Sequence, residues 1–198
     1  MRTKLSPRLS KKKLKKCSIV LQLIEFNMKK ILITGGTGFV GKNLVDHFRA
    51  RHEVLIVSRS SHDFTDSEVS WSSLDIRDEE KTISLIRKLT PEVVIHAAGN
   101  KDVRYCEKNT DDAFLVNSVG TRNVAQAARM IGAKMVYIST DLIFPSTAGN
   151  YTELDIPHSP LAYGRSKYAG ESYAILETDN LAVCRTGGLY GRYSPLLN

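Results

Sequence analysis

The sequence has few of the residues that would build a disulfide framework, a metal site or a hydrolytic centre. Its three cysteines, Cys17, Cys106 and Cys184, lie far apart and form no C-x-x-C motif, so neither a disulfide scaffold nor a zinc site is indicated. The five histidines form no H-E-x-x-H pattern, and G-x-S-x-G is absent. No apolar run approaches the roughly 20 residues of a membrane span. We therefore expect free thiols, no metal, no membrane segment and a cytoplasmic protein.

The chain also has little net charge once its first 27 residues are set aside. The 198 residues carry 28 Lys and Arg against 21 Asp and Glu, a net charge of +7. Residues 1–27 hold eight basic residues and one acidic residue (8 − 1 = +7), so residues 28–198 hold 20 of each sign. We expect residues 1–27 to be a basic leader, disordered or artefactual, ahead of a natural start at Met28. A tail for nucleic acid or an anionic membrane is the alternative, but the balanced remainder predicts no nucleic-acid partner.

From Met28 onward, predicted strands and helices alternate within one domain, residues 28–198. Apolar runs predict strands at 30–34, 53–58, 93–97, 134–139 and 181–185, with a further strand ahead of Asp75. Apolar residues at helical spacing and end signals predict helices around 40–48, at 78–89, at 116–131 and from Pro160 onward. This alternation predicts an α/β fold, a doubly wound, Rossmann-like parallel sheet with helices on both faces.

Four glycines fall within seven residues at the end of the first predicted strand. Gly35, Gly38 and Gly41 fit the turn of a dinucleotide site, where a bare backbone lets a pyrophosphate approach the next helix. Residues 36–42 also approach a P-loop, but Asn43 stands where that loop needs a hydroxyl for Mg²⁺. A glycine-rich turn with no ligand is the third reading, so the rest of the chain must decide.

In a doubly wound sheet, ligands bind beyond the carboxyl ends of the strands. Arg59 lies 18 residues past Gly41, close to where an NAD site carries an acidic residue, and an arginine there suits a 2′-phosphate. We therefore predict NADP(H) as the preferred cofactor, with NAD(H) as the alternative. The residues predicted to line the cofactor site are Gly35, Thr37, Gly38, Phe39, Val40, Gly41, Ser58, Arg59, Asp75, Ile76, Ala97, Ala98 and Gly99.

Tyr163 and Lys167 are four residues apart on a predicted helix, so their side chains share one face. An ammonium beside the phenol should lower the pKa of Tyr163 and make it a usable proton donor or acceptor. Thr140, just past a predicted strand, could hydrogen-bond the oxygen whose proton Tyr163 handles. A chance Tyr–Lys pair and an ordinary turn threonine are the alternatives when each is taken alone.

A set of motifs in a fixed order resembles the extended short-chain dehydrogenases/reductases, from Met28 to about Gly191. The motifs are TGGTGFVG (34–41), LDIRD (74–78), HAAG (96–99), NSVGTRN (117–123), ISTD (138–141), YGRSK (163–167) and RTGGLYG (185–191). The resemblance implies a catalytic Thr140, Tyr163 and Lys167, with Tyr163 as acid, Lys167 on the nicotinamide ribose and Thr140 at the substrate's keto oxygen. It adds Asn117, Tyr163 and Lys167 to the cofactor-binding residues.

Within that superfamily, STDLIFP (139–145) and SPLAYGRSKYAGE (159–171) look most like dTDP-4-dehydrorhamnose reductases. This resemblance implies NADPH-dependent reduction of a 4-keto nucleotide sugar. Leu142 stands where related dehydratases carry an acidic residue, which argues against dehydration. Two alternatives remain: an NAD-dependent sugar-nucleotide epimerase, and a non-catalytic dinucleotide-binding protein such as the regulatory subunit of methionine adenosyltransferase.

The resemblance also implies that the nucleotide-sugar pocket lies largely after RTGGLYG, where only seven more residues follow here. We therefore expect a domain truncated before its substrate-binding region, inactive by itself. Apolar surface left bare would favour association, for example as a homo-oligomer.

Overall fold

The computed structural model describes residues 28–60, 69–145, 147, 149–190 and 192–193. The predicted leader, residues 1–27, lies outside the described residues. A single six-stranded sheet has the strand order β3-β2-β1-β4-β5-β6, and every neighbouring pair is parallel. The strands are β1 (Lys30–Thr34), β2 (Glu53–Ser58), β3 (Ser70–Ser73), β4 (Val93–His96), β5 (Lys134–Thr140) and β6 (Leu181–Thr186). The predicted Rossmann-like parallel sheet is confirmed.

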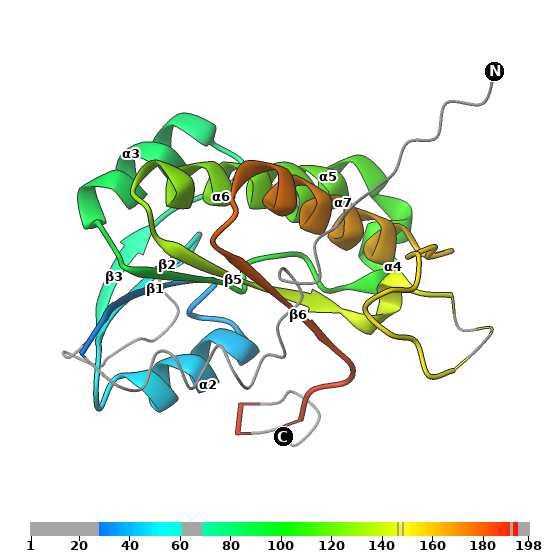
Figure 1. Ribbon diagram of the computed structural model, residues 1–198, viewed down its shortest axis with the longest axis horizontal. Coiled ribbons are helices and arrows are strands. Elements are labelled where there is room, and N and C mark those ends of the chain that lie inside the picture. Colours follow the sequence, from blue (N-terminus) through cyan, green and yellow to red (C-terminus); the bar gives the residue numbers. More distant parts are fainter. Residues whose placement is uncertain (1–27, 61–68, 146, 148, 191, 194–198) are drawn as a thin grey trace.

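Helices cover both faces of this sheet (Figure 1). One face carries α2 (Phe39–Phe48), whose Val45 and Phe48 are buried against the sheet. The helices on the other face are α3 (Glu79–Leu89), α4 (Val103–Lys108), α5 (Thr110–Phe114), a π-helical turn η1 (Leu115–Val119), α6 (Gly120–Met130) and α7 (Ala162–Glu177). A short 3₁₀ turn, η2 (Asp141–Ile143), follows β5. Each face of the sheet thus carries its own apolar core.

The turn from β1 into α2 depends on its glycines. Gly35 has φ of 69°, and a Cβ there would lie 2.8 Å from the backbone of Ala98. At Gly41 a Cβ would collide with the carbonyl of Gly35 and with Gly36. The glycines therefore allow α2 to begin directly against the strand end, with its first backbone N–H groups facing the open edge.

Several helix ends follow the sequence signals, with small shifts. Asp78 caps α3 by accepting a hydrogen bond from the backbone N–H of Lys81 at 3.0 Å. Gly132, with φ of 68°, ends α6 as predicted. The helix expected from Val116 begins earlier, at Thr110, and passes through the π-helical turn. The helix expected at Pro160 begins at Ala162, and α4 was not predicted.

Candidate functional site

Two adjoining cavities form one groove across the carboxyl ends of the central strands. Their volumes are about 350 and 270 Å³, and both are lined by Gly35, Gly38, Ala97 and Gly99. The cavity toward β2 adds Thr37, Ser58, Arg59, Asp75, Ile76 and Ala98. The cavity toward β5 adds Phe39, Val40, Gly41, Thr140, Tyr163 and Lys167. The structure thus brings together every site residue predicted from the sequence except Asn117, in the order that an extended dinucleotide would need.

At the β2 end of the groove, Ser58 and Asp75 already form hydrogen bonds with neighbouring residues. The Ser58 hydroxyl donates to the carbonyl of Ser60 at 2.7 Å and accepts a hydrogen bond from the Trp71 indole at 2.9 Å. The carboxylate of Asp75 pairs with Arg77 at 2.6 Å, and this hydrogen-bonded guanidinium lowers the pKa of Asp75. Arg59 is exposed and its charge acts on Asp75 in the same direction. Arg59 is therefore a cation at the groove's mouth that an added phosphate could contact.

At the β5 end, the side chains of Thr140 and Tyr163 line the same cavity. The Thr140 hydroxyl donates to Asp141 Oδ1 and accepts from the backbone N–H of Leu142, each at 3.2 Å, which fixes its position at the start of η2. The expected lowering of the Tyr163 pKa by Lys167 is wrong in this structure. Burial raises the pKa of Tyr163, and the nearby Thr140 hydroxyl only partly opposes that rise. The phenol is thus held protonated, as a proton donor must be.

Lys167 directs its ammonium to β5. Its Nζ donates to the carbonyl of Ile138 at 2.7 Å and lies 4.2 Å from the ring centroid of Tyr137. The side chain is buried, and this burial lowers the pKa of Lys167 to about 7, against the opposing charge of Glu171. The shared helical face predicted for Tyr163 and Lys167 therefore places both in the groove.

Asn117 lies behind the groove, within the π-helical turn, and is fully buried. Its Oδ1 accepts from the backbone N–H of Asn100 at 2.7 Å, and its Nδ2 donates to the carbonyl of Asn100 and to Ser166 Oγ, each at 3.0 Å. A Cβ at Gly99 would lie 2.8 Å from Asn117 Oδ1. Asn117 therefore shapes the loop after β4 and fixes α7 without lining the cavities.

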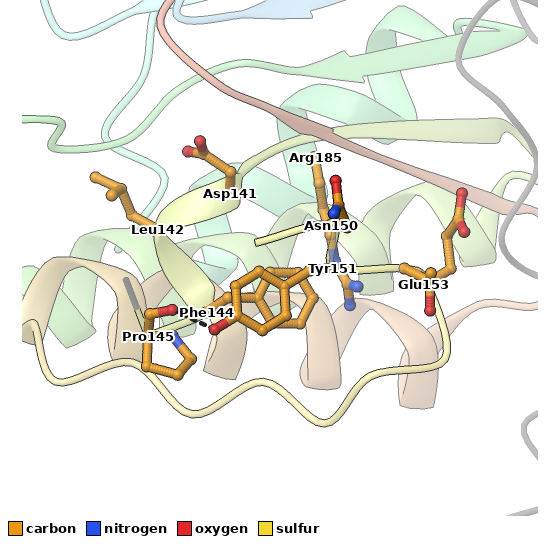
Figure 2. A pocket seen from close by; sticks show the side chains of 9 residues that line it. Asp141, Leu142, Phe144, Pro145, Asn150, Tyr151, Glu153 and Arg185 are labelled. Atoms are coloured by element: carbon orange, nitrogen blue, oxygen red, sulfur yellow. Dashed lines mark hydrogen bonds between the residues drawn. The ribbon is translucent and has the colours of Figure 1, made fainter. Parts of the chain in front are cut away.

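A larger cavity of about 610 Å³ adjoins the β5 end of the groove at Asp141 (Figure 2). The rings of Phe144 and Tyr151 stack in parallel, with centroids 4.6 Å apart, and Arg185 lies 5.3 Å from the Phe144 centroid. Its remaining lining residues are Leu142, Pro145, Asn150, Thr152 and Glu153. Because Asp141 follows Thr140 directly, a molecule bound there could reach Thr140.

Sequence reasoning missed some of the groove's lining. Asn100 and Lys101 follow β4, Thr186 ends β6, and Gly187 and Leu189 come after it; all five line the cavity of Tyr163. The same strand-end rule that found the other residues would have found these, had it been applied to the last strand and one step further after HAAG.

Neither a metal site nor a membrane span is found in the part of the chain that the structure describes. No three His, Cys, Asp or Glu side chains there gather around a point that could hold a metal ion. No described helix combines the length and apolar character needed to cross a membrane.

The fold and groove define a Rossmann-like α/β domain, and the comparisons specify its family. The chain belongs to the family described as RmlD substrate binding domain, whose model matches residues 28–196. It is 33% identical over 171 residues to the dTDP-4-dehydrorhamnose reductase of Aggregatibacter actinomycetemcomitans, covering 84% of this chain and 53% of that one. It is also 31% identical over 181 residues to methionine adenosyltransferase 2 subunit beta of Rattus norvegicus, covering 91% and 53%.

Solved structures agree with this assignment. The dTDP-4-dehydrorhamnose reductase of Bacillus anthracis, in complex with NADP, superposes with a TM-score of 0.70 at 31% identity, over 84% of this chain and 56% of that one. The Bordetella bronchiseptica enzyme WbmG, in complex with NAD and UDP, gives 0.71 at 26% identity, over 80% and 53%. The chain thus spans about half the length of the relatives it matches.

Proposed function

We propose that this domain carries out the NADP(H)-dependent reduction of a 4-keto nucleotide sugar, as a dTDP-4-dehydrorhamnose reductase does. The observation that carries the proposal is the single groove that joins the glycine turn of β1 to Thr140, Tyr163 and Lys167. The family match and the relatives with that activity support it. Because those relatives are about twice as long, the complete activity is proposed for this domain together with a region such as the unmatched half of those relatives.

Each catalytic side chain has a defined task in this proposal. A bound nicotinamide would supply the hydride to the keto carbon. Tyr163 donates its phenolic proton to the oxygen that becomes the hydroxyl, and the raised pKa of Tyr163 keeps this proton available. Thr140, which lines the same cavity as Tyr163, orients the keto oxygen by a second hydrogen bond once its hydroxyl turns from Asp141. Lys167, fixed on β5, faces the groove where the nicotinamide ribose would lie.

NADP(H) is proposed as the better cofactor because of Arg59. An exposed guanidinium beside Ser58 and Ser60 can pair with a 2′-phosphate that NAD(H) lacks. Fluorescence titration of the 198-residue chain with NADPH and NADH should give the lower Kd for NADPH. Arg59→Ala should remove that preference, whereas Arg87→Ala, at an exposed position of α3, should retain it. Equal or tighter NADH binding by the unaltered chain would overturn the NADP(H) assignment.

Acid catalysis by Tyr163 is tested in this domain joined to the unmatched half of a reductase relative. Tyr163→Phe should lower turnover of a dTDP-4-keto sugar by roughly 10²- to 10⁴-fold while leaving the Kd for NADPH near that of the unaltered protein. Tyr173→Phe, at an exposed position of the same helix, is the matched control. Unchanged turnover in the Tyr163 variant would exclude Tyr163 as the acid.

A non-catalytic function is the second candidate, favoured by the 31% identity to the beta subunit of methionine adenosyltransferase 2. In that case the full protein would bind the dinucleotide without reducing any keto sugar and would co-purify with a synthetase. The WbmG likeness supports an NAD-dependent enzyme as a further alternative, which the same cofactor titration addresses.

A further inference from the structure

Lys167 is fixed by two neighbouring residues of one strand. Tyr137 and Ile138 are adjacent on β5, and the Lys167 ammonium contacts the ring of the first, 4.2 Å from its centroid, and the carbonyl of the second at 2.7 Å. Tyr137 has no exposed surface. An ammonium over a desolvated aromatic ring is attracted by the ring's negative face, so the ring is a binding partner for the charge as well as a packing surface.

The Tyr137 ring is itself fixed by His96. These residues face each other in the register of β4 and β5, and their rings stack with centroids 5.3 Å apart at 19°. Thr121 Oγ1 donates its proton to the carbonyl of Asn117 at 2.7 Å, so it accepts a hydrogen bond from His96 Nε2 at 3.0 Å. The other ring nitrogen, Nδ1, then accepts from the Thr34 hydroxyl at 2.6 Å. His96 is therefore a neutral imidazole with both nitrogens engaged, and burial lowers its pKa to about 3.

The hydroxyl of Tyr137 connects the same ring to the catalytic helix. It donates to the carbonyls of Asn117 and Lys167, each at 3.4 Å. A Cβ at Gly170 would lie 2.7 Å from this hydroxyl oxygen, so glycine is what allows α7 to approach it. The backbone of Lys167 and its ammonium are thus both held by one side chain.

The two tyrosines near Lys167, Tyr163 and Tyr137, therefore differ in their environment. Tyr163 lines the groove, where a substrate can reach it, whereas Tyr137 is enclosed between β4, β5 and α7. Burial raises the pKa of Tyr137 above its ordinary value, so this phenol stays neutral beside the ammonium.

We propose that Tyr137 is a positioning residue for Lys167, with His96 holding its ring in place and thereby connecting the lysine to the turn at Thr34. The proposal rests on the proposed function in one respect only, that Lys167 contacts the dinucleotide. The face of the Tyr137 ring positions the Lys167 ammonium. The Tyr137 hydroxyl helps to hold α7 in place through two long hydrogen bonds.

The test compares two substitutions of Tyr137 in the 198-residue chain. Tyr137→Phe keeps the ring and should leave the Kd for NADPH within about twofold. Tyr137→Leu removes the ring face and should raise that Kd about three- to thirtyfold, the range expected for a cation–π contact. In the double variant Tyr137→Leu/Lys167→Met, the Kd should be no higher than in Lys167→Met alone, because both changes remove one interaction. Additive losses, or equal losses in the Phe and Leu variants, would overturn the proposal.

A second measurement needs neither cofactor binding nor a folded leucine variant. In the NMR spectrum of lysine-labelled chain, the ε-methylene protons of Lys167, assigned by their absence in Lys167→Met, should be shifted upfield by the Tyr137 ring. Tyr137→Phe should retain this shift. An unshifted Lys167 resonance in the unaltered chain would refute the contact. An upfield shift without any NADPH binding would instead refute the proposed function and leave the Tyr137–Lys167 contact standing.

Discussion

Replacing Lys167 by methionine should stabilise the fold at neutral pH, because the site lysine is buried at a cost. Its pKa falls from 10.5 to about 7 in the folded chain, a difference of 10.5 − 7 = 3.5. Below pH 7 both states are protonated, and the native state bears the full cost of the buried charge. As the pH rises from 7 to 10.5, only the unfolded state keeps the proton, so the free energy of unfolding increases. Above pH 10.5 the lysine is neutral in both states, so its burial no longer lowers the free energy of unfolding.

The size of the effect follows from about 1.4 kcal/mol for each unit of pKa difference. Lys167→Met should therefore raise the free energy of unfolding by about 5 kcal/mol at pH 6, a gain that falls to about 2 kcal/mol at pH 9. The charged and titratable groups around the ammonium are Glu171, His96 and Tyr137. Because the variant keeps all three, their own titrations largely cancel in the difference between the two proteins.

The assay is urea unfolding of the 198-residue chain at pH 6, 7.5 and 9, for the unaltered protein, Lys167→Met and Lys88→Met. Lys88 is exposed in the last turn of α3, so its variant should show a small and constant difference. A Lys167→Met protein that is less stable than the unaltered one at pH 6, or whose gain does not change with pH, would refute this account of the buried ammonium.

Three further predictions concern the core, the turn and the leader. Glu171→Gln should destabilise the chain by about 3–5 kcal/mol in urea unfolding, because it removes the buried carboxylate that pairs at 2.8 Å with Arg185, whose side chain is only 17% exposed. Glu177→Gln should cost under about 1 kcal/mol, and equal costs would contradict this. Gly41→Ala should lower the free energy of unfolding by about 1–3 kcal/mol and abolish NADPH binding in the fluorescence titration, because its Cβ collides with Gly35 and Gly36. Gly149→Ala is the control, since a Cβ there meets open space. NADPH binding by the Gly41 variant would show that the turn tolerates a side chain. Deleting residues 1–27 should leave the Tm and the Kd for NADPH unchanged, since β1 is already paired on both sides by β2 and β4, and a large fall in Tm would show otherwise.

Elements with a strong apolar pattern were predictable from the sequence with their bounds, whereas β3 was expected only as a strand ahead of Asp75 and α4 was not expected. Strands such as β2 and β5 are buried along most of their length, and their apolar runs reveal them. The strand β3 reads Ser-Trp-Ser-Ser and is mostly exposed, so it has no such run. Its place depends on backbone pairing with β2 and on the Trp71–Ser58 hydrogen bond, which no local pattern encodes. The six-residue α4 is likewise too short for a helical stripe to indicate it.

The groove's lining followed from one rule about strand ends, but the protonation of its side chains did not. The spacing of Tyr163 and Lys167 fixed the face they share and left open where the ammonium would point. In the structure it points to Ile138 and Tyr137, which lie some 30 residues earlier in the sequence. The burial that raises the pKa of Tyr163 depends on the same long-range packing. Such environments arise only once distant strands and helices are assembled.

The position of β1 in the middle of the sheet has a consequence for how the chain is made. β1 meets β2 after 53 − 30 = 23 residues, but its other edge is paired only by β4, with Ile31 opposite Val93 (93 − 31 = 62). At about 5–20 residues per second, a ribosome needs about 3–12 s to add that length. Throughout this interval the apolar strand Lys30–Thr34 offers an unpaired edge to other nascent chains. Slow codons between residues 58 and 93 should therefore increase aggregation in the cell, whereas slow codons after His96 should not.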